Sequence, residues 1–143
     1  MKSKTVNHRR SDCPISVALE LFGDRWSLLI VRDLMFKQRN TFIDFINAEE
    51  RIATNILTDR LHSLEIANIV TKTPHPKDTR RSIYRLTSKG LDLAPVLIEM
   101  IVWSATHEVT AAPASEVRKM RKNRDKVISD IRVQLSTSSK ISP

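Results

Sequence analysis

The spacing of hydrophobic residues predicts three short helices near the start of the chain. The first begins at Pro14, which a first helical turn tolerates, and ends at Gly23. Asp24 is expected to cap the second helix, which ends near Phe36, and Thr41 is expected to cap the third. Each helix places its apolar residues three or four positions apart, so that one side can be buried.

A fourth helix has the clearest pattern. Leu57, Leu61 and Leu64 recur at positions i, i+4 and i+7 and predict one buried stripe. The opposite face carries small polar side chains and few long charged ones. This helix is therefore the first candidate for contact with another molecule.

Beyond the fourth helix the pattern changes to extended segments. Residues 69–73 are rich in β-branched side chains, residues 74–79 are turn-forming, and residues 81–87 are extended again, so a β-hairpin is predicted. Residues 72–89 carry six basic side chains against one acidic one. A basic hairpin tip suits a phosphate backbone, although a charged hairpin can also be merely solvated.

The C-terminal part is predicted to be helical. A long helix follows from Thr87, with Pro95 in its first turns or at a kink, and Pro113 ends it. A basic amphipathic helix follows over residues 116–135, and residues 136–143 are expected to be disordered. The apolar stripe of the basic helix favours packing across a dimer, whereas its charge favours nucleic acid.

The amino-acid composition excludes several classes of protein function. A length of 143 residues with 41% hydrophobic residues fits one domain with a modest appendage. No apolar run is long enough to span a membrane, and residues 1–12 lack the apolar core of a secretory signal, so we expect a cytoplasmic protein. A single cysteine and four scattered histidines predict neither a disulfide nor a metal site. With two glycines and no catalytic motif, the chain is not expected to be an enzyme or to use a cofactor.

The order of predicted elements is that of a mainly α (α+β) winged helix-turn-helix. In this fold the fourth helix would enter a major groove of DNA, while the hairpin, or wing, would lie along phosphates or reach a minor groove. The net charge of +8 agrees with an acidic partner. We therefore divide the chain into a basic flexible arm (residues 1–12), a DNA-binding domain (13–112) and a basic C-terminal helix with its tail (113–143).

Several short motifs occur in one order along residues 13–107, and together they resemble the HxlR-type regulators, a winged-helix family related to the MarR family. The motif residues include Cys13 and Pro14; Gly23, Asp24, Arg25 and Trp26; Arg32, Asp33 and Leu34; residues 57–61 with Leu64 and Glu65; Tyr84, Leu86, Thr87 and Gly90; and Pro95 with Trp103.

The resemblance implies a homodimer held by its first and last helices. Two residues depart from the family pattern. Ala53 replaces a usual serine, so the cap of the fourth helix is weakened or shifts to Thr54. Asn68 replaces a usual glycine, which a left-handed position after a helix tolerates.

We expect the polar face of the fourth helix to contact DNA, because short polar side chains can approach base edges closely. A solvated helix face is the alternative. Asp59 is expected to orient Arg60 or to accept a hydrogen bond from a cytosine amine. Arg60 is interpreted as a phosphate clamp or as half of an ion pair that holds the helix. The residues assigned to this face are Thr54, Asn55, Thr58, Asp59, Arg60 and His62.

A second set of residues is expected to contact the DNA backbone. Lys77, Arg80 and Arg81 lie in the wing, where Arg81 could instead brace the hairpin. Arg25 and Thr41 stand at the starts of predicted helices, whose N–H groups can bind anions.

Cys13 is the candidate for redox sensing. It precedes a helix, whose N-terminal dipole favours the thiolate, and basic residues lie close to it in the sequence. Some relatives in the resembled family look like thiol-based switches at this place. A buried and inert cysteine is the alternative.

Four aromatic residues could line a small-molecule pocket, but a core role is favoured because the chain has few aromatics. They are Trp26, Phe42, Phe45 and Trp103.

The sequence thus predicts a sequence-specific DNA-binding transcriptional regulator that binds a pseudo-palindromic operator as a homodimer. Its expected partners are double-stranded DNA and a second copy of the chain, with a small-molecule or electrophile effector left open and no membrane. The rival hypothesis is a winged-helix module that binds RNA or protein without specific DNA readout.

Overall fold

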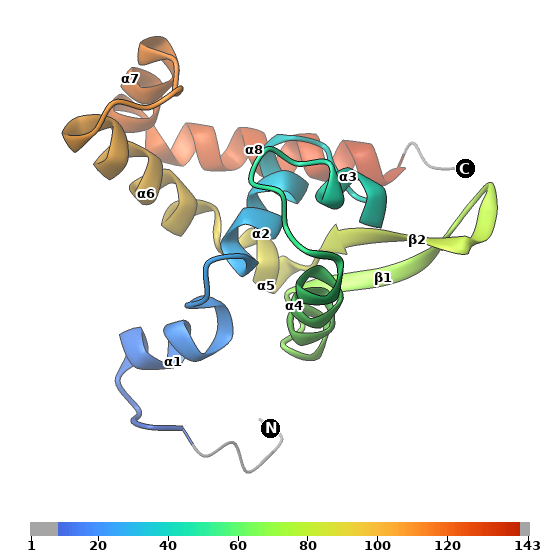
Figure 1. The fold of residues 1–143 in the computed structure, drawn as a ribbon. Coiled ribbons are helices and arrows are strands. Elements are labelled where there is room, and N and C mark those ends of the chain that lie inside the picture. The colour runs from blue at the N-terminus through green and yellow to red at the C-terminus, as the bar shows by residue number, and fades with distance from the viewer. Residues whose placement is uncertain (1–8, 141–143) are drawn as a thin grey trace.

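A computed structural model describes residues 9–140, which form a mainly helical fold with one antiparallel hairpin (Figure 1). The elements are α1 (Pro14–Phe22), α2 (Ser27–Phe36), α3 (Phe42–Ile46), α4 (Thr54–Ile66), β1 (Val70–His75), β2 (Asp78–Leu86), α5 (Ser88–Leu91), α6 (Ala94–His107), α7 (Ala114–Lys122) and α8 (Arg124–Lys140). This order confirms the predicted winged helix-turn-helix.

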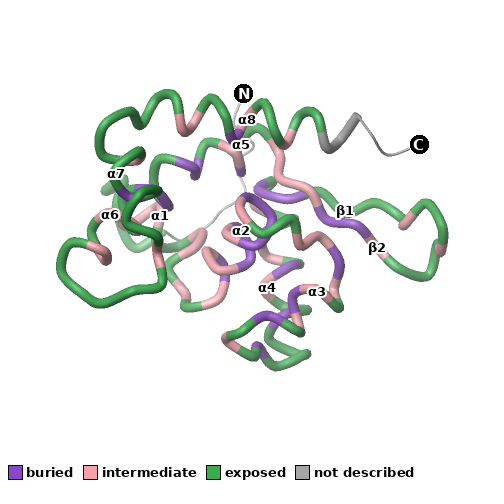
Figure 2. Tube along the Cα trace, turned by 90° about the horizontal axis from the view of Figure 1, so that it is seen from above, coloured by how far each residue is buried: buried purple, intermediate pink, exposed green. Residues whose placement is uncertain are grey.

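The core forms around α2, where buried segments of several helices meet (Figure 2). Leu57, Leu61 and Leu64 of α4 are at most 2% exposed, which confirms the predicted buried stripe. Val31 from α2 and Ile98 from α6 are fully buried in the same cluster. Because these residues occupy one side of α4, the other side is left to the solvent.

Asp24 caps the turn that leads into α2. Its Oδ2 accepts hydrogen bonds from the N–H groups of Trp26 (2.9 Å) and Ser27 (3.0 Å). The N-cap residue of α2 is Trp26 and not Asp24 as predicted, because the helix begins only at Ser27, but the Asp24 carboxylate still binds N–H groups at this end of the helix.

The hairpin is fixed to the domain at its root. β1 and β2 pair with Val70 opposite Leu86, and the register shifts between Pro74 and His75 near the turn. The N–H of Tyr84 donates to the carbonyl of Asn40 at 2.8 Å, just before α3. The wing therefore cannot tilt at its root without disturbing the start of α3.

The turn after α4 has the predicted left-handed residue. Asn68 has a φ of 59°, and the N–H of Ile69 donates to the carbonyl of Leu64 at 2.9 Å, which closes the helix. Gly90 packs against this turn, since a Cβ at residue 90 would lie 2.3 Å from the carbonyl oxygen of Ile69. The connection between α4 and the hairpin is thus closely packed.

The long helix expected from Thr87 is divided. α5 ends at Leu91 and α6 begins at Ala94, so that Pro95 occupies the first turn of α6, where its missing N–H costs nothing. α6 ends at His107, and Pro113 is the N-cap of α7 instead of the end of α6.

The predicted single C-terminal helix is also wrong. Asn123, with φ −148° and ψ 65°, separates α7 from α8, and α8 continues to Lys140, so residues 136–140 are helical instead of disordered. The break allows Val117 and Ile131, each 7% exposed, to reach the body of the same chain. Residues 141–143 and most of the predicted N-terminal arm, residues 1–8, lie outside the described part.

α8 packs on its own chain, with Ile131 in the core cluster. Two ion pairs attach the C-terminal helices to the acidic segment before them: Arg132 to Asp92 (2.5 Å) and Arg124 to Glu99 (2.6 Å). The apolar stripe that was expected to favour a dimer is therefore largely covered within one protomer. No helix in the described part of the chain is long and apolar enough to cross a membrane.

Candidate nucleic-acid interface

The exposed face of α4 carries the residues that the sequence assigned to base contact. Thr54, Asn55, Thr58, Asp59 and His62 are all exposed. Within residues 9–140 the side chains of Asn55 and His62 make no hydrogen bond, whereas the hydroxyl of Thr58 donates to the carbonyl of Thr54 at 3.0 Å. The amide of Asn55 therefore keeps its donors and acceptor for an external partner.

The N-terminus of α4 lacks a side-chain cap. Ala53 is the N-cap residue and has extended dihedral angles, φ −70° and ψ 145°, while the helix itself begins at Thr54. The cap is thus weakened, as expected, and does not shift to Thr54. The N–H groups of the first turn consequently stay available to solvent or to an anion.

Arg60 connects α4 to the turn before α2. Its Nε donates to Oδ2 of Asp59 at 3.1 Å, and its Nη1 lies 3.6 Å from Oδ1 of Asp24. Burial alone would raise the pKa of Asp24, but hydrogen bonds from Ser27 and Trp26 and the charge of Arg60 lower it overall. These contacts favour the ion-pair role of Arg60, and they give Asp59 the orienting role that was expected.

Thr41 is the buried N-cap residue of α3. It is 8% exposed, and its Oγ1 accepts a hydrogen bond from the N–H of Asp44 at 3.3 Å. The carboxylate of Asp44 in turn accepts from the N–H groups of Thr41 and Asn40. This capping box explains the position of Thr41 without a phosphate, and phosphate contact by Thr41 stays a prediction.

Arg25 is exposed in the turn before α2, with its guanidinium carbon 5.4 Å from the centre of the Trp26 ring. This position leaves the cation accessible beside the start of α4, since Trp26 borders the same hollow as Asn55 and Ile56.

The wing presents its cations at the tip. Lys77 and Arg81 are exposed, and the side chain of Arg80 is 90% exposed while it pairs with Asp78 at 3.1 Å. The side chain of Arg81 makes no hydrogen bond in the described region, but its charge contributes to the lowered pKa values of Asp44 and Asp78. Both roles considered for Arg81 therefore stay predictions. Arg85, which the sequence did not single out, donates to Oγ1 of Thr73 at 3.1 Å across the hairpin. Its position diagonal to Thr73 on the neighbouring strand was the signal that could have identified it.

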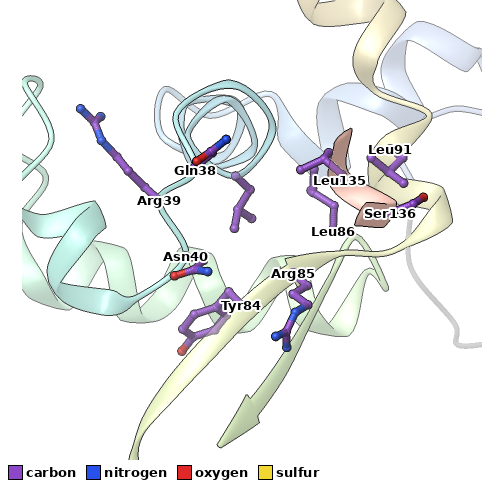
Figure 3. Close-up of a pocket in the computed structure, with 10 residues that line it drawn as sticks. Gln38, Arg39, Asn40, Tyr84, Arg85, Leu86, Leu91, Leu135 and Ser136 are labelled. Carbon is purple, nitrogen blue, oxygen red and sulfur yellow. The ribbon is translucent and has the colours of Figure 1, made fainter. Parts of the chain in front are cut away.

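The arrangement places α4 and the wing on one side of the molecule. Figures 1 and 2 both show α2 between α4 and α8, with the hairpin extending outward from beside α4. The C-terminal part of α8, however, lies beside the root of β2 (Figure 1), where Leu135 and Leu86 line one hollow (Figure 3). The expected contribution of α8 to DNA affinity stays a prediction.

Cys13 is the exposed N-cap residue of α1. Hydrogen bonds from the N–H groups of Ser16 and Ile15 lower the pKa of its thiol. On the same helix Ile15 and Leu19 are 72% and 58% exposed. The cysteine is thus not buried, and its thiol stands beside an uncovered apolar surface. Its role in redox sensing stays a prediction. The basic residues that lie close to Cys13 in the sequence are His8, Arg9 and Arg10; Arg9 and Arg10 are exposed, and His8 lies outside the described residues.

The four aromatic residues do not form a pocket. Phe45 is 1% exposed and packs against Tyr84 with ring centres 6.0 Å apart, whereas Trp103 is 63% exposed beside His107. Residues 9–140 also contain no group of three side chains suited to hold a metal ion.

Comparison with known proteins identifies the same family. Residues 21–111 match the model of the HxlR-like helix-turn-helix family. An uncharacterized HTH-type transcriptional regulator of Synechocystis, sll1512, is 36% identical over 88 residues, which cover 62% of this chain and 64% of that relative, less than two thirds of its length. The HTH-type transcriptional regulator YodB of Bacillus subtilis is 34% identical over 64% of this chain and 82% of its own.

Similar solved structures point to the same family. The reduced form of YodB superposes with a TM-score of 0.55 at 33% identity, covering 68% of this chain and 95% of that one. YodB has also been solved after diamide treatment and with a quinone bound. These relatives are named as transcriptional regulators and not as enzymes, as the sequence predicted. With nearly two thirds of its length matched by the family model, this chain belongs to the HxlR-like helix-turn-helix family.

Proposed function

We propose that this protein is a cytoplasmic transcriptional regulator that binds a pseudo-palindromic DNA duplex as a homodimer. The observation that carries the proposal is the exposed polar face of α4, with the unused amide of Asn55, beside a wing whose tip carries Lys77, Arg80 and Arg81. α4 would enter the major groove, where an asparagine can pair with both N6 and N7 of adenine. The wing cations would neutralise phosphates and supply affinity that does not depend on sequence.

The second copy would dock on the uncovered apolar surface of α1 and α6. Ile15 and Leu19 on α1 and Met100 and Trp103 on α6 are at least half exposed. An apolar hollow of about 260 Å³ lies beside them between α2 and α6. A symmetric dimer of this kind suits a palindromic site, because helix-turn-helix dimers bind half-sites roughly 34 Å apart, one turn of DNA.

Oxidation of Cys13 would regulate DNA binding by this protein. Its exposed thiol lies at the start of α1, next to the proposed dimer surface, and the similar YodB has been solved in a diamide-treated form. Diamide would accept two electrons and two protons from two Cys13 thiols, which join as an intersubunit disulfide while the diamide becomes a hydrazine. A mixed disulfide with a small thiol is the other product that this exposure permits.

Selection of bound duplexes from a random library tests the proposal. The reduced protein is expected to recover a palindromic motif, and the diamide-treated protein to lose it, while a Cys13→Ser variant recovers the motif under both conditions. If wild type and Cys13→Ser respond to diamide alike, the thiol has no sensing role. If no motif is recovered and the protein binds single-stranded RNA or another protein instead, the hypothesis of a DNA-binding regulator is wrong. The rival hypothesis, a winged-helix module that binds RNA or protein, would then take its place.

A further inference from the structure

An open hollow of about 330 Å³ lies where the first turns of α4 face the turn before α2. The residues that line it are Asp24, Trp26, Asn55, Ile56, Asp59 and Arg60. The hollow borders the polar face of α4, because Asn55 belongs to both. A base pair that reaches the amide of Asn55 therefore also comes close to this hollow.

Ile56 is an apolar side chain in a polar setting. It is 37% exposed, whereas Leu57 beside it is fully buried. Among residues 54–60 it is the one apolar residue outside the buried stripe. A β-branched side chain keeps one preferred χ1 rotamer in a helix, so little side-chain entropy is lost when it meets a partner. The hollow thus offers a rigid apolar contact next to the amide of Asn55.

The charges in the hollow favour the edge of a base over a phosphate. Two carboxylates, Asp24 and Asp59, line it against the guanidinium of Arg60, which pairs with both of them. These carboxylates would repel a phosphate, whereas the amino groups of adenine and cytosine donate hydrogen bonds in the major groove. Within residues 9–140 Oδ1 of Asp59 makes no hydrogen bond, so it can accept one from such an amino group.

A cation for the neighbouring phosphate stands outside the hollow. Arg25 is exposed, and its guanidinium carbon lies over the ring of Trp26, 5.4 Å from the ring centre. Because Trp26 borders the hollow, Arg25 stands at the rim. A cation at the rim and an apolar contact inside match a DNA strand, whose phosphates lie outside and whose base edges line the major groove.

We propose that Ile56 contacts the C5-methyl group of a thymine in each half-site and so determines specificity for thymine at that position. The methyl group of thymine is the apolar group that bases present in the major groove, and cytosine lacks it. The thymine lies at or next to the base pair that Asn55 contacts. This contact rests on the proposed binding of duplex DNA.

Deoxyuridine in place of thymidine tests the proposal, because it removes the methyl group and keeps every hydrogen-bonding group. The probes are the duplexes that selection from a random library recovers, with each thymidine replaced in turn. At one position in each half-site, deoxyuridine is expected to weaken binding by the full chain about fourfold, which corresponds to one buried methyl group. Replacement in both half-sites should weaken binding about fifteenfold. No penalty at any position would overturn the proposal.

Two isoleucine variants of α4 assign the contact. Ile56→Ala should bind the thymidine and deoxyuridine duplexes equally, because the contacting group is gone. Ile66→Ala, at a 73% exposed position about 15 Å further along the helix, should keep the wild-type penalty. Circular dichroism checks that each variant folds, and if Ile56→Ala does not, Ile56→Val takes its place and should reduce the penalty.

The outcomes separate this contact from the function on which it rests. A full deoxyuridine penalty in the folded variant of Ile56 would overturn the role of Ile56 and leave the proposed DNA binding intact. If the wild-type chain recovers no duplex motif, both proposals are wrong.

Discussion

The ammonium group of Lys89 donates a hydrogen bond to the carbonyl oxygen of Ala67 at 2.7 Å, so a residue of α5 closes the C-terminus of α4. The bond joins two segments that lie on either side of the hairpin in the sequence. A cation also suits this end of the helix, where the dipole is negative. The orientation of α4 is thus coupled to the chain that returns from the wing.

Replacing Lys89 by methionine should therefore destabilise the domain. The variant keeps most of the apolar stem but loses the donor and the charge, and a loss of about 0.5–1 kcal/mol in the free energy of unfolding is expected for such an exposed bond. Urea unfolding measures the difference, with Lys72→Met on the exposed side of β1 as the control. Equal loss in both variants would show that the cap contributes nothing.

Ala53→Ser should stabilise the protein. Residue 53 already has the extended dihedral angles of a helix N-cap, so the serine hydroxyl can accept a hydrogen bond from a first-turn N–H of α4 without moving the backbone. A gain of about 1 kcal/mol is expected in thermal or urea unfolding. Ala114→Ser, inside the first turn of α7 and not at its cap, is the comparison, and a similar gain there would refute the capping explanation.

Protonation of Asp24 should account for part of the loss of stability at low pH. The pKa of this carboxyl is lowered in the folded state, so its contribution is complete above the ordinary pKa of aspartate and is lost as the pH falls through the lower folded value. Asp24→Asn should therefore reduce the loss of stability between about pH 5 and pH 2. Unfolding curves across this range, with Asp12→Asn as an exposed control, measure it; an unaltered pH profile would contradict the assignment.

Two substitutions should separate the two parts of the DNA interface. Asn55→Ala is expected to remove sequence preference, because a bidentate base contact contributes about 1–3 kcal/mol of discrimination. Arg80→Ala should weaken binding to all duplexes about equally and reduce the slope of log K against log salt by about 0.9. Gel-shift titrations at two salt concentrations distinguish these effects, and an unchanged slope for Arg80→Ala would remove the wing tip from the interface.

The elements that sequence reasoning located well are those set by local periodicity. The stripe of α4 and the left-handed Asn68 both follow from neighbours in the sequence. Thr41 shows the limit of such reasoning, because helix capping and anion binding favour the same residue type, and the sequence alone did not indicate the capping box that Thr41 forms with Asp44.

Tertiary packing determined the features that the sequence did not reveal. The break at Asn123 lets Ile131 reach the core cluster, whose other buried members lie at residues 30–98 and are far away in the sequence. The hollow that Leu86 and Leu135 line is likewise formed by four separate segments, none of which carries a motif for ligand binding.

The packing of α8 makes this helix part of the segment that folds as one domain. A fragment that ends at residue 112, as the sequence suggested for the DNA-binding domain, would lack Ile131 and the two arginines that pair with Asp92 and Glu99. The loss of α8 would expose the apolar residues of the core cluster that it covers, and large exposed apolar patches promote association. Heterologous expression of this protein therefore calls for a gene that extends through residue 140.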